Sequence, residues 1–353
     1  MMPLNRLGLV VHQGRPAAVA AARTARLWCA ARGIACTDID VWRQGEPRHG
    51  GQEEAEAAGH PGSIITFGGD GTFLRGARIA AKDGASVLGV NVGRVGFLTE
   101  ITTDQVEEAL DVLHRDQAVI EERMVLTLRA SRPLQTPVGL DTVLCFGRGP
   151  ALPAPTLRPA GPQPVGWGVA LDVTAVNDVV LEKLARDRQA SVAVYLAGQL
   201  LASYSADAVI MATPTGSTAY NFAAGGPVLD PSADAIVFTP VAPHMAFGRT
   251  VIAAADEAVA VRVLPHSGRV AVSIDGQTRG VLDPGDWVAV YRAPYRLRLA
   301  RLAPLEFYHR LRERFQLADA PAAAIDQTPL FHRPDSPPPD DLAHLRLPTP
   351  PVA

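Results

Sequence analysis

Residues 63–75, Ser-Ile-Ile-Thr-Phe-Gly-Gly-Asp-Gly-Thr-Phe-Leu-Arg, constrain the fold more than any other stretch of the chain. Ser63 to Phe67 form a short β-branched and apolar run, which is typical of a strand buried on both faces of a parallel sheet. From Thr72 onward, apolar residues recur at the spacing of an amphipathic helix. A strand that turns directly into a helix is the building unit of an α/β domain.

The turn between this strand and helix is Gly68-Gly69-Asp70-Gly71. Glycines let a ligand approach the backbone closely, and the free N–H groups of a helix N-terminus favour an anion. Because Asp70 would repel a phosphate, its position indicates proton abstraction or contact with Mg²⁺. The alternative is an ordinary turn or N-cap role. The stretch is neither a Walker A loop nor the Gly-x-Gly-x-x-Gly dinucleotide fingerprint.

Two arginines follow on the same predicted helix. Arg75 and Arg78 are three residues apart and could share a helix face. Their spacing favours a solvated surface pair, and Arg75 is kept as a candidate binding residue.

The composition of the chain limits the number of domains and the kinds of partner that can be expected. A chain of 353 residues with 47% hydrophobic residues is long enough for two domains with their own cores. The net charge of −3 does not favour nucleic acid or an anionic membrane as a partner. Cys29, Cys36 and Cys145 show no metal-binding spacing and no disulfide framework. With no signal peptide or membrane-spanning run in view, the expected protein is a cytoplasmic enzyme.

Residues 1–121 are predicted to form an α/β, Rossmann-like domain. Alternating strands and helices indicate a mostly parallel sheet. The strands are expected at 7–11, 39–42, 63–67 and 86–91, and the helices at 17–32, 52–58 (a short helix or a loop) and 103–114.

Residues 122–303 are predicted to form a β-rich domain of two packed sheets. Its strands are expected at 124–129, 169–173, 191–196, 207–211, 235–239, 249–253, 258–263 and 270–274. Asp275-Gly276 is a hairpin signal, which would explain these two residues unless a ligand also recruits them.

Three segments lie outside these two patterns. The proline-rich stretch 130–166 is predicted to be a partly mobile insertion between two strands. Residues 304–317 are expected to form a last helix that packs back on the N-terminal domain. The proline-rich stretch 318–353 is predicted to be a disordered tail.

A second unusual segment runs from Thr213 to Asp230. A helix is predicted after Gly216, capped by Thr215 or Ser217 and ended by Gly225-Gly226-Pro227. Its hydroxyl groups could hold ribose, an amide or phosphate, although a capped helix alone would also explain them. Asn177-Asp178, expected at the end of an apolar run, adds a donor and acceptors that suit a base or ribose edge.

Five motifs occur in the order seen in NAD kinases, which the chain resembles over roughly residues 5 to 315. The motifs are Gly68-Gly-Asp-Gly-Thr72, Asn91-x-Gly-x-x-Gly-Phe-Leu98, Asn177-Asp-Val-Val-Leu181, Thr213-Pro-Thr-Gly-Ser-Thr-Ala-Tyr220 and Asp275-Gly-Gln277. The first alone is weak, because lipid kinases and phosphofructokinases share it. The fourth is close to diagnostic.

The resemblance implies transfer of the γ-phosphoryl group of ATP to the 2′-hydroxyl of the adenosine ribose of NAD, which gives NADP. It implies an α/β N-terminal domain, a β-sandwich-like C-terminal domain and an active site between them. It also implies Mg²⁺ or another divalent cation with ATP, and a homodimer or homotetramer whose neighbouring subunit helps to complete the NAD site. No residue of the chain is predicted as a dedicated metal ligand.

The resemblance also implies roles for individual residues. Asp70 matches the catalytic base that takes the 2′-hydroxyl proton, and Asp207 matches an acidic residue used on NAD bound to an adjoining subunit. The remaining candidate binding residues are the phosphate-facing Gly68, Gly69, Gly71 and Thr72, the helix residue Arg75, the dinucleotide-contacting Asn177 and Asp178, the adenine and ribose wall Thr215, Gly216, Ser217, Thr218, Ala219 and Tyr220, and the turn residues Asp275 and Gln277.

Departures and rivals qualify this interpretation. The family usually has Asp-Gly at Asp207-Ala208, and the extra Cβ would be strained in a glycine-only conformation. The insertion is also longer than the family's usual hairpin. A lipid kinase is the first alternative, but the chain shows no basic amphipathic helix. A non-catalytic NAD-binding sensor on the same scaffold is the second. The donor, ATP or polyphosphate, and the acceptor, NAD or NADH, are left open.

Overall fold

The computed structural model describes residues 4–41, 51–93, 96–135, 166–185, 188–245, 247–303 and 307–317. Met1–Leu305 form one unit, and Glu306–Ala353 form another, of which helix α6 (Phe307–Phe315) is described. Trp42, Cys145, most of the predicted insertion (136–165) and the predicted tail lie outside the described residues.

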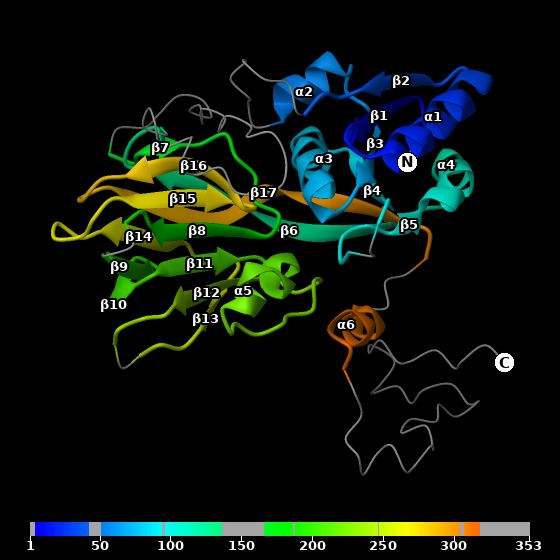
Figure 1. Cartoon of the computed structure of the whole chain (residues 1–353). Helices are drawn as coiled ribbons and strands as arrows, with labels where there is room; N and C mark the ends of the chain where they lie inside the picture. Colours follow the sequence, from blue (N-terminus) through cyan, green and yellow to red (C-terminus); the bar gives the residue numbers. More distant parts are fainter. Residues whose placement is uncertain are drawn as a thin grey trace, which may run out of the picture. The chain divides into compact units, whose positions relative to one another are not determined.

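Alternating strands and helices make up the N-terminal half, as the sequence predicts (Figure 1). The elements are β1 (Arg6–Val11), α1 (Pro16–Ala31), β2 (Ala35–Asp38), α2 (Gln52–Ala57), β3 (Ser63–Gly68), α3 (Asp70–Asp83), β4 (Ser86–Asn91), β5 (Ile101–Thr102), the 3₁₀ turn η1 (Thr103–Gln105) and α4 (Val106–His114). Strand β1 pairs in parallel with β2 and β3, and β3 pairs in parallel with β4. Every residue of β3 and β4 is buried, as expected of central strands of a parallel sheet.

Strands dominate the second half. They are β6 (Val119–Ala130), β7 (Val169–Ala170), β8 (Asp178–Lys183), β9 (Ala190–Leu196), β10 (Gln199–Ala206), β11 (Ala208–Ala212), β12 (Ala235–Val241), β13 (Val251–Ala254), β14 (Val259–Val263), β15 (Val270–Ile274), β16 (Gln277–Leu282) and β17 (Trp287–Arg301). Between β11 and β12 lie the 3₁₀ turn η2 (Thr215–Thr218) and the short helix α5 (Tyr220–Ala223). The β-rich second domain is therefore confirmed.

Strand β17 joins the two halves into one sheet. It pairs antiparallel with β6 along almost its whole length and with β14 over its first residues, and near its end Arg298 and Leu299 pair in parallel with β4. Among the described residues, the main path of this sheet is β10-β9-β14-β17-β4-β3-β1-β2, and a second sheet has the order β13-β12-β11-β8-β15-β16. The sequence reasoning did not anticipate β17, whose apolar alternation is interrupted by arginine, tyrosine and Pro294.

Three buried clusters position these layers. One contains side chains of α1, α4 and β1, and a second contains side chains of α2, α3 and β3, so helices cover both faces of the parallel sheet. The third joins residues of both large sheets, including Leu126 and Val290 from one and Val179 and Met211 from the other. The two sheets of the second half therefore pack face to face, as in a β-sandwich.

Some predicted element boundaries are wrong. The second strand is Ala35–Asp38 rather than 39–42, because Gly33 (φ +66°) ends α1 and the chain reverses at once. The predicted strand 169–173 is reduced to the two residues of β7. Asp178 begins β8 rather than ending an apolar run, and β10 and β16 were not predicted.

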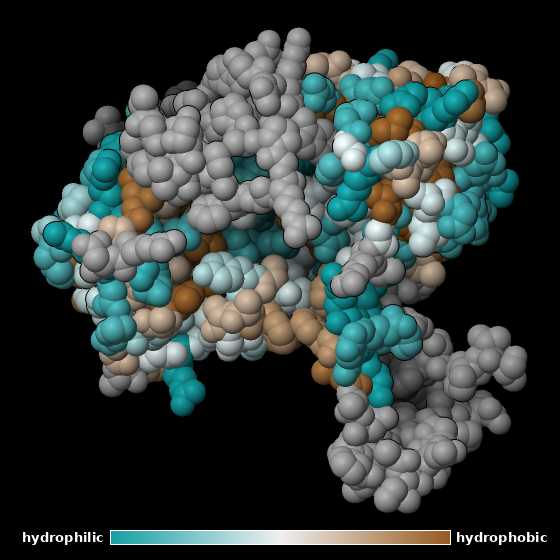
Figure 2. Space-filling view, viewed as in Figure 1, coloured by the Kyte–Doolittle hydropathy of each residue, from teal (hydrophilic) through white to brown (hydrophobic). Residues whose placement is uncertain are grey.

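The surface is mixed. On the face drawn in Figure 2, hydrophilic residues cover much of the described surface, and hydrophobic ones form separate patches. Among the described residues, none of the helices combines the length and hydrophobicity needed to cross a lipid bilayer.

Candidate active site

The Gly-Gly-Asp-Gly turn lies where β3 ends and α3 begins. Gly69 precedes the helix, and its carbonyl accepts hydrogen bonds from the backbone N–H groups of Thr72 (2.9 Å) and Phe73 (3.0 Å). Asp70 is the first residue of α3 and is partly exposed, and Gly71 beside it is exposed. A carboxylate and free backbone N–H groups therefore meet at an accessible helix start.

The loop after β4 holds the Asp70 carboxylate. Phe97 N–H donates to Asp70 Oδ2 (3.1 Å), and Leu98 N–H donates to Asp70 Oδ1 (3.4 Å). A Cβ on Gly96 would lie 1.9 Å from Asp70 Oδ1, so only glycine permits this approach. The first two motifs are thus one structural unit, which sequence spacing did not reveal.

Asn91 shapes the same loop from its other end. Its side-chain amide donates to the carbonyl of Gly93 (3.1 Å), and its Oδ1 accepts from Gly93 N–H (3.0 Å). Asn91 also pairs with Gly68 at the ends of β4 and β3. The asparagine of this motif therefore closes a turn beside the Gly-Gly-Asp-Gly turn.

The third and fourth motifs also form one unit. Thr213 N–H donates to the carbonyl of Asn177 (2.8 Å), and Thr213 Oγ1 donates to the carbonyl of Val176 (2.6 Å). Gly216 N–H donates to Thr213 Oγ1 (2.9 Å), and a Cβ on Gly216 would lie 2.0 Å from the Asn177 carbonyl oxygen. This contact explains why the motif has glycine at its centre.

The helix predicted after Gly216 is only partly formed, and its predicted caps are wrong. The 3₁₀ turn η2 covers Thr215–Thr218, α5 follows with only four residues, and neither has a side-chain cap. Ala219 between them (φ −97°, ψ −127°) is outside the helical region, so the chain bends there.

The polar side chains of this segment differ in their partners. Ser217 Oγ donates to the carbonyl of Pro214 (2.7 Å) and accepts from Leu229 N–H (3.0 Å). Thr218 Oγ1 donates to the carbonyl of Thr215 (3.3 Å). The Oγ1 of Thr215 is buried and has no hydrogen-bond partner within the described part of the chain. Tyr220 is 41% exposed, which leaves its ring available to a ligand or a second subunit.

Asp275 ties the fifth motif to the third. Asp275 and Gly276 both have positive φ (48° and 72°), as in a type I′ turn, and link β15 to β16. The predicted hairpin is confirmed. The Asp275 carboxylate accepts backbone N–H bonds from the segment that begins at Val176, the shortest being 2.7 Å from Asn177.

Burial perturbs the charged groups around Asp275. Burial, with a smaller effect of Asp275, raises the pKa of Asp178 to about 7. Burial also raises the pKa of Asp275, while its backbone hydrogen bonds and Arg78 act in the opposite direction. Arg78 is only 8% exposed, so the predicted solvated arginine pair is wrong. The spacing of apolar residues along α3 did not reveal this burial, because the guanidinium faces other buried charges rather than solvent.

Two remaining candidates have protein partners. Arg75 Nη1 donates to the carbonyl of Val41 (3.5 Å), and Gln277 Oε1 accepts from Arg279 Nη2 (2.9 Å). Arg279 itself, 3% exposed, was not singled out from the sequence.

Asp207 forms an ion pair with Lys183, with Nζ and Oδ1 2.5 Å apart. The backbone at Ala208 is not in the left-handed region, and Ala208 pairs with Val241 and Glu182 as the first residue of β11. The expected strain of a glycine-only conformation is therefore absent at this residue.

The two groups of motifs meet across α3. Val176 shares a buried cluster with Phe73 and Ala77 of α3 and with Leu98. Arg78, two turns after Asp70 on the same helix, interacts electrostatically with Asp275. All five motifs thus lie in contact with α3 or with segments packed against it.

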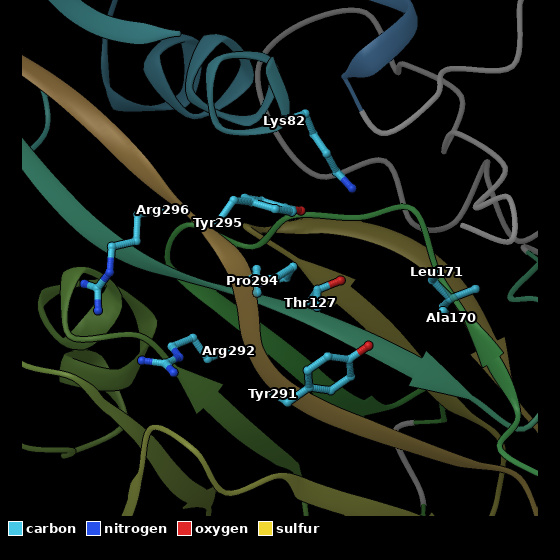
Figure 3. A pocket seen from close by; sticks show the side chains of 10 residues that line it. Lys82, Thr127, Ala170, Leu171, Tyr291, Arg292, Pro294, Tyr295 and Arg296 are labelled. Atoms are coloured by element: carbon cyan, nitrogen blue, oxygen red, sulfur yellow. The ribbon is translucent and has the colours of Figure 1, made fainter. Parts of the chain in front are cut away.

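The cavity in Figure 3, about 600 Å³ in volume, is at the other end of α3. Lys82 in the last turn of α3 points towards Tyr295 and forms an ion pair with Asp172 (2.6 Å). The residues that line this cavity are Lys82, Thr127, Ala170, Leu171, Tyr291, Arg292, Ala293, Pro294, Tyr295 and Arg296. None of them is a predicted site residue.

Comparison with known proteins gives the family. The family model described as the ATP-NAD kinase N-terminal domain matches residues 7–118, and the ATP-NAD kinase C-terminal domain matches residues 176–302. The chain belongs to the NAD kinase family. The protein named NAD kinase 1 of Streptomyces avermitilis is 62% identical over 98% of this chain and 97% of its own length. NAD kinase 1 of Streptomyces coelicolor is 60% identical over 99% and 96%.

Solved structures share the fold. Yeast NADH kinase complexed with NADH has a TM-score of 0.67 at 17% identity and covers 94% of this chain and 91% of its own. An NAD kinase from Archaeoglobus fulgidus in complex with ATP has a TM-score of 0.59 at 18% identity, covering 88% and 98%. Family membership makes the chain a kinase, and a lipid kinase is not favoured.

Proposed function

We propose that the chain transfers the γ-phosphoryl group of ATP to the 2′-hydroxyl of the adenosine ribose of NAD, giving NADP and ADP. One observation carries this proposal beyond the family match. A partly exposed carboxylate, Asp70, is fixed at the start of α3 by two backbone amides of the loop after β4. Such a carboxylate is positioned but still able to accept a proton.

The geometry supports Asp70 as the general base. A carboxylate offers about four lone-pair sites, and the amides of Phe97 and Leu98 occupy one on each oxygen. A remaining lone pair can accept the proton of the 2′-hydroxyl while that oxygen attacks the γ-phosphorus and ADP leaves. A general base typically contributes about 10²–10⁴-fold.

The other roles follow from position. The turn of Gly68, Gly69, Gly71 and Thr72 would face the phosphates of ATP at the start of α3, with the N–H groups of Gly69 and Gly71 as donors. Asn177 and Asp178 would contact the dinucleotide, and η2 with Tyr220 would form the wall around its adenine and ribose. Phosphoryl transfer asks the protein mainly for positioning and neutralisation of charge, which these groups supply.

A divalent cation enters this scheme with ATP. Mg²⁺ is usually bound through substrate phosphates and one or two carboxylates rather than by a dedicated protein cage. Asp70, at the phosphate-facing turn, carries an oxygen of the kind that Mg²⁺ prefers. When bound, the cation supplies positive charge to the phosphates, which the turn lacks without a Walker lysine.

The finer assignments are also proposals. We expect a homodimer or homotetramer, in which the partly exposed Asp207 reaches NAD bound to the adjoining subunit. We expect the reaction in the cytoplasm, where ATP and NAD are both available.

The experiment is an assay of the purified chain with ATP, Mg²⁺ and NAD, followed by detection of NADP with a dehydrogenase specific for it. Parallel reactions replace ATP with polyphosphate and NAD with NADH, and a sizing measurement gives the number of subunits. NADP formation supports the proposal. A chain that binds NAD without forming NADP would instead be a sensor, and phosphorylation of a lipid would restore the first alternative.

A further inference from the structure

Asp275 is the most heavily hydrogen-bonded carboxylate near the proposed NAD site. Its Oδ1 accepts from Asn177 N–H (2.7 Å) and Asp178 N–H (3.3 Å), and both of its oxygens lie 3.0–3.1 Å from Val176 N. Its own N–H donates to the carbonyl of Asp178 (3.0 Å). One side chain therefore fixes three consecutive peptide groups, immediately before β8.

The turn conformation makes these contacts possible. Asp275 has a φ of +48°, a left-handed conformation that asparagine and aspartate tolerate better than most residues. Ile274 before it still pairs with Val179 of β8. The carboxylate is thus placed at the end of the β8–β15 ladder, where it accepts from the amides of residues 176–178.

Helix α3 brings a buried cation to the same place. Arg78 is 8% exposed and interacts with Asp275, and Arg279 of β16, 3% exposed, lies close to both. Burial lowers the pKa of each guanidinium, and in Arg279 the neighbouring Arg78 lowers it further, while Asp275 and Glu54 oppose this. Two buried like charges are tolerated only because carboxylates lie among them.

Two carboxylates act on Arg78, Glu54 first and then Asp275. The Nε of Arg78 has no hydrogen-bond partner within the described segments, and the same is true of Arg279 Nε. Because Asp70 begins α3 and Arg78 lies two turns later, the helix that carries the proposed base also carries the cation that faces the Asp275 turn.

We propose that Asp275 and Arg78 are a pair of positioning residues, which hold Asn177 and Asp178 in the conformation that receives NAD and fix that segment to helix α3. Neither side chain touches the substrate in this scheme. The inference rests on the proposed function, because it gives Asn177 and Asp178 a role in NAD binding. It reassigns Asp275 from ligand contact to support of the contacting residues.

The test separates NAD binding from turnover. Asp275→Asn exchanges an acceptor oxygen for an NH₂ group that faces N–H donors, and Arg78→Met removes the cation at similar volume. Each is expected to raise KM for NAD about tenfold or more, with kcat and KM for ATP changed less than threefold. Arg78→Lys keeps the charge and should recover part of the NAD affinity.

Arg123→Met is the matched control. Arg123 is also 3% exposed and forms an ion pair with Glu121 (2.6 Å). The charged groups that act on it are Glu121, Arg301 and Asp230, which are not proposed NAD contacts. Its loss should lower the melting temperature, as Arg78→Met should also do, without raising KM for NAD. The Asp275→Asn/Arg78→Met double variant should raise KM for NAD by less than the product of the single effects, because the two residues act as a unit.

Direct titration of NAD, without ATP, keeps this test independent of the proposed function. Wild-type NADP formation decides whether the chain is an active kinase. Weaker NAD binding in Asp275→Asn and Arg78→Met, but not in Arg123→Met, supports the positioning pair. Folded variants that bind NAD like the wild type would overturn it, and so would effects of the two substitutions that multiply independently.

Discussion

Two turns of this chain contain Asp followed by Gly, and their aspartate carboxylates differ in role. Asp70-Gly71 starts helix α3, and Asp275-Gly276 links β15 to β16. In both, the carboxylate accepts backbone N–H bonds from a segment distant in sequence, namely residues 97–98 for Asp70 and 176–178 for Asp275.

The two carboxylates differ in how many hydrogen bonds they accept from the protein. Asp70 receives two amide bonds of 3.1 and 3.4 Å and stays partly exposed. Asp275 receives a 2.7 Å bond and further amide bonds, and it has a buried guanidinium beside it. A carboxylate whose lone pairs all accept hydrogen bonds from the protein has a structural role. A carboxylate with free lone pairs can also act on a substrate. The local sequence, Asp followed by Gly, does not distinguish the two.

The largest expected effect is that of Asp70→Asn. An amide cannot take the hydroxyl proton, so kcat should fall by about 10²–10⁴-fold or more while NAD affinity stays largely intact. Steady-state kinetics and NAD titration on the same preparation would measure both. The result should be the inverse of that for Asp275→Asn, and an equal loss of NAD affinity and turnover would remove the distinction between the turns.

Gly96→Ala should come next. The new Cβ would lie 1.9 Å from Asp70 Oδ1, so the carboxylate must move. A displacement of about 1 Å at a catalytic group can cost about 10²-fold in rate. Gly62→Ala is the control, because a Cβ there has no neighbour within 4 Å and Gly62 does not have positive φ. Wild-type kcat in Gly96→Ala would show that the position of Asp70 is not critical.

The pH dependence of NAD binding should show a smaller effect. Burial raises the pKa of Asp178 to about 7, so its ionised fraction rises about tenfold between pH 6 and pH 8. If the carboxylate accepts ribose hydroxyls, KM for NAD should fall by about that factor over this range. Asp178→Asn should flatten the profile, and a wild-type KM independent of pH would contradict the contact.

The same group makes stability depend on pH in the opposite direction. Because the folded-state pKa of Asp178 is raised above its unfolded value of 3.8, the folded chain binds more protons between about pH 4 and pH 7. The free energy of unfolding should therefore fall as pH rises through this window, by up to about 1.4 kcal/mol per pH unit. Denaturant unfolding of the wild type and Asp178→Asn measures the difference.

The smallest effect concerns two hydroxyl groups, one with hydrogen-bond partners in the protein and one without such a partner among the described residues. Ser217 Oγ has protein partners, whereas the buried Thr215 Oγ1 has none within the described residues. Thr215→Val should leave stability unchanged or raise it by about 1 kcal/mol, and should raise KM for NAD only a few-fold. Ser217→Ala should instead lower the melting temperature. Unchanged NAD affinity in Thr215→Val would remove this hydroxyl from the site.

Local patterns predicted much of the fold. The bounds of β4 and β15 match the prediction, because each is a short apolar run between clear turn signals. Strand β17 was not predicted, since its arginines and tyrosines interrupt the apolar pattern and find partners, such as Asp234 and Thr174, that are close only in the folded chain. The helix expected after Gly216 is shorter than predicted, because contact with the Asn177 carbonyl sets the backbone at Gly216.

The sequence predicted the separate motifs of the site but not the contacts between them. Spacing alone left Asp70 with a turn role as an equal alternative, and the order of the five motifs supplied the family. The contacts that join the motifs run through backbone amides, such as those of Phe97 and Leu98, which no side-chain pattern encodes. Arg78 was misjudged because one of the two carboxylates that act on it, Asp275, is almost 200 residues away in the sequence.

Strand β17 has a consequence for how the chain is made. Because Arg298 and Leu299 pair with Ser86 and Val87 of β4, the first half of the protein leaves the ribosome with that part of the β4 edge unpaired, and its partner is synthesised about 200 residues later. The first half of the chain therefore cannot complete its sheet on its own. Its α/β layer gains the last of its described strand partners only when β17 has emerged.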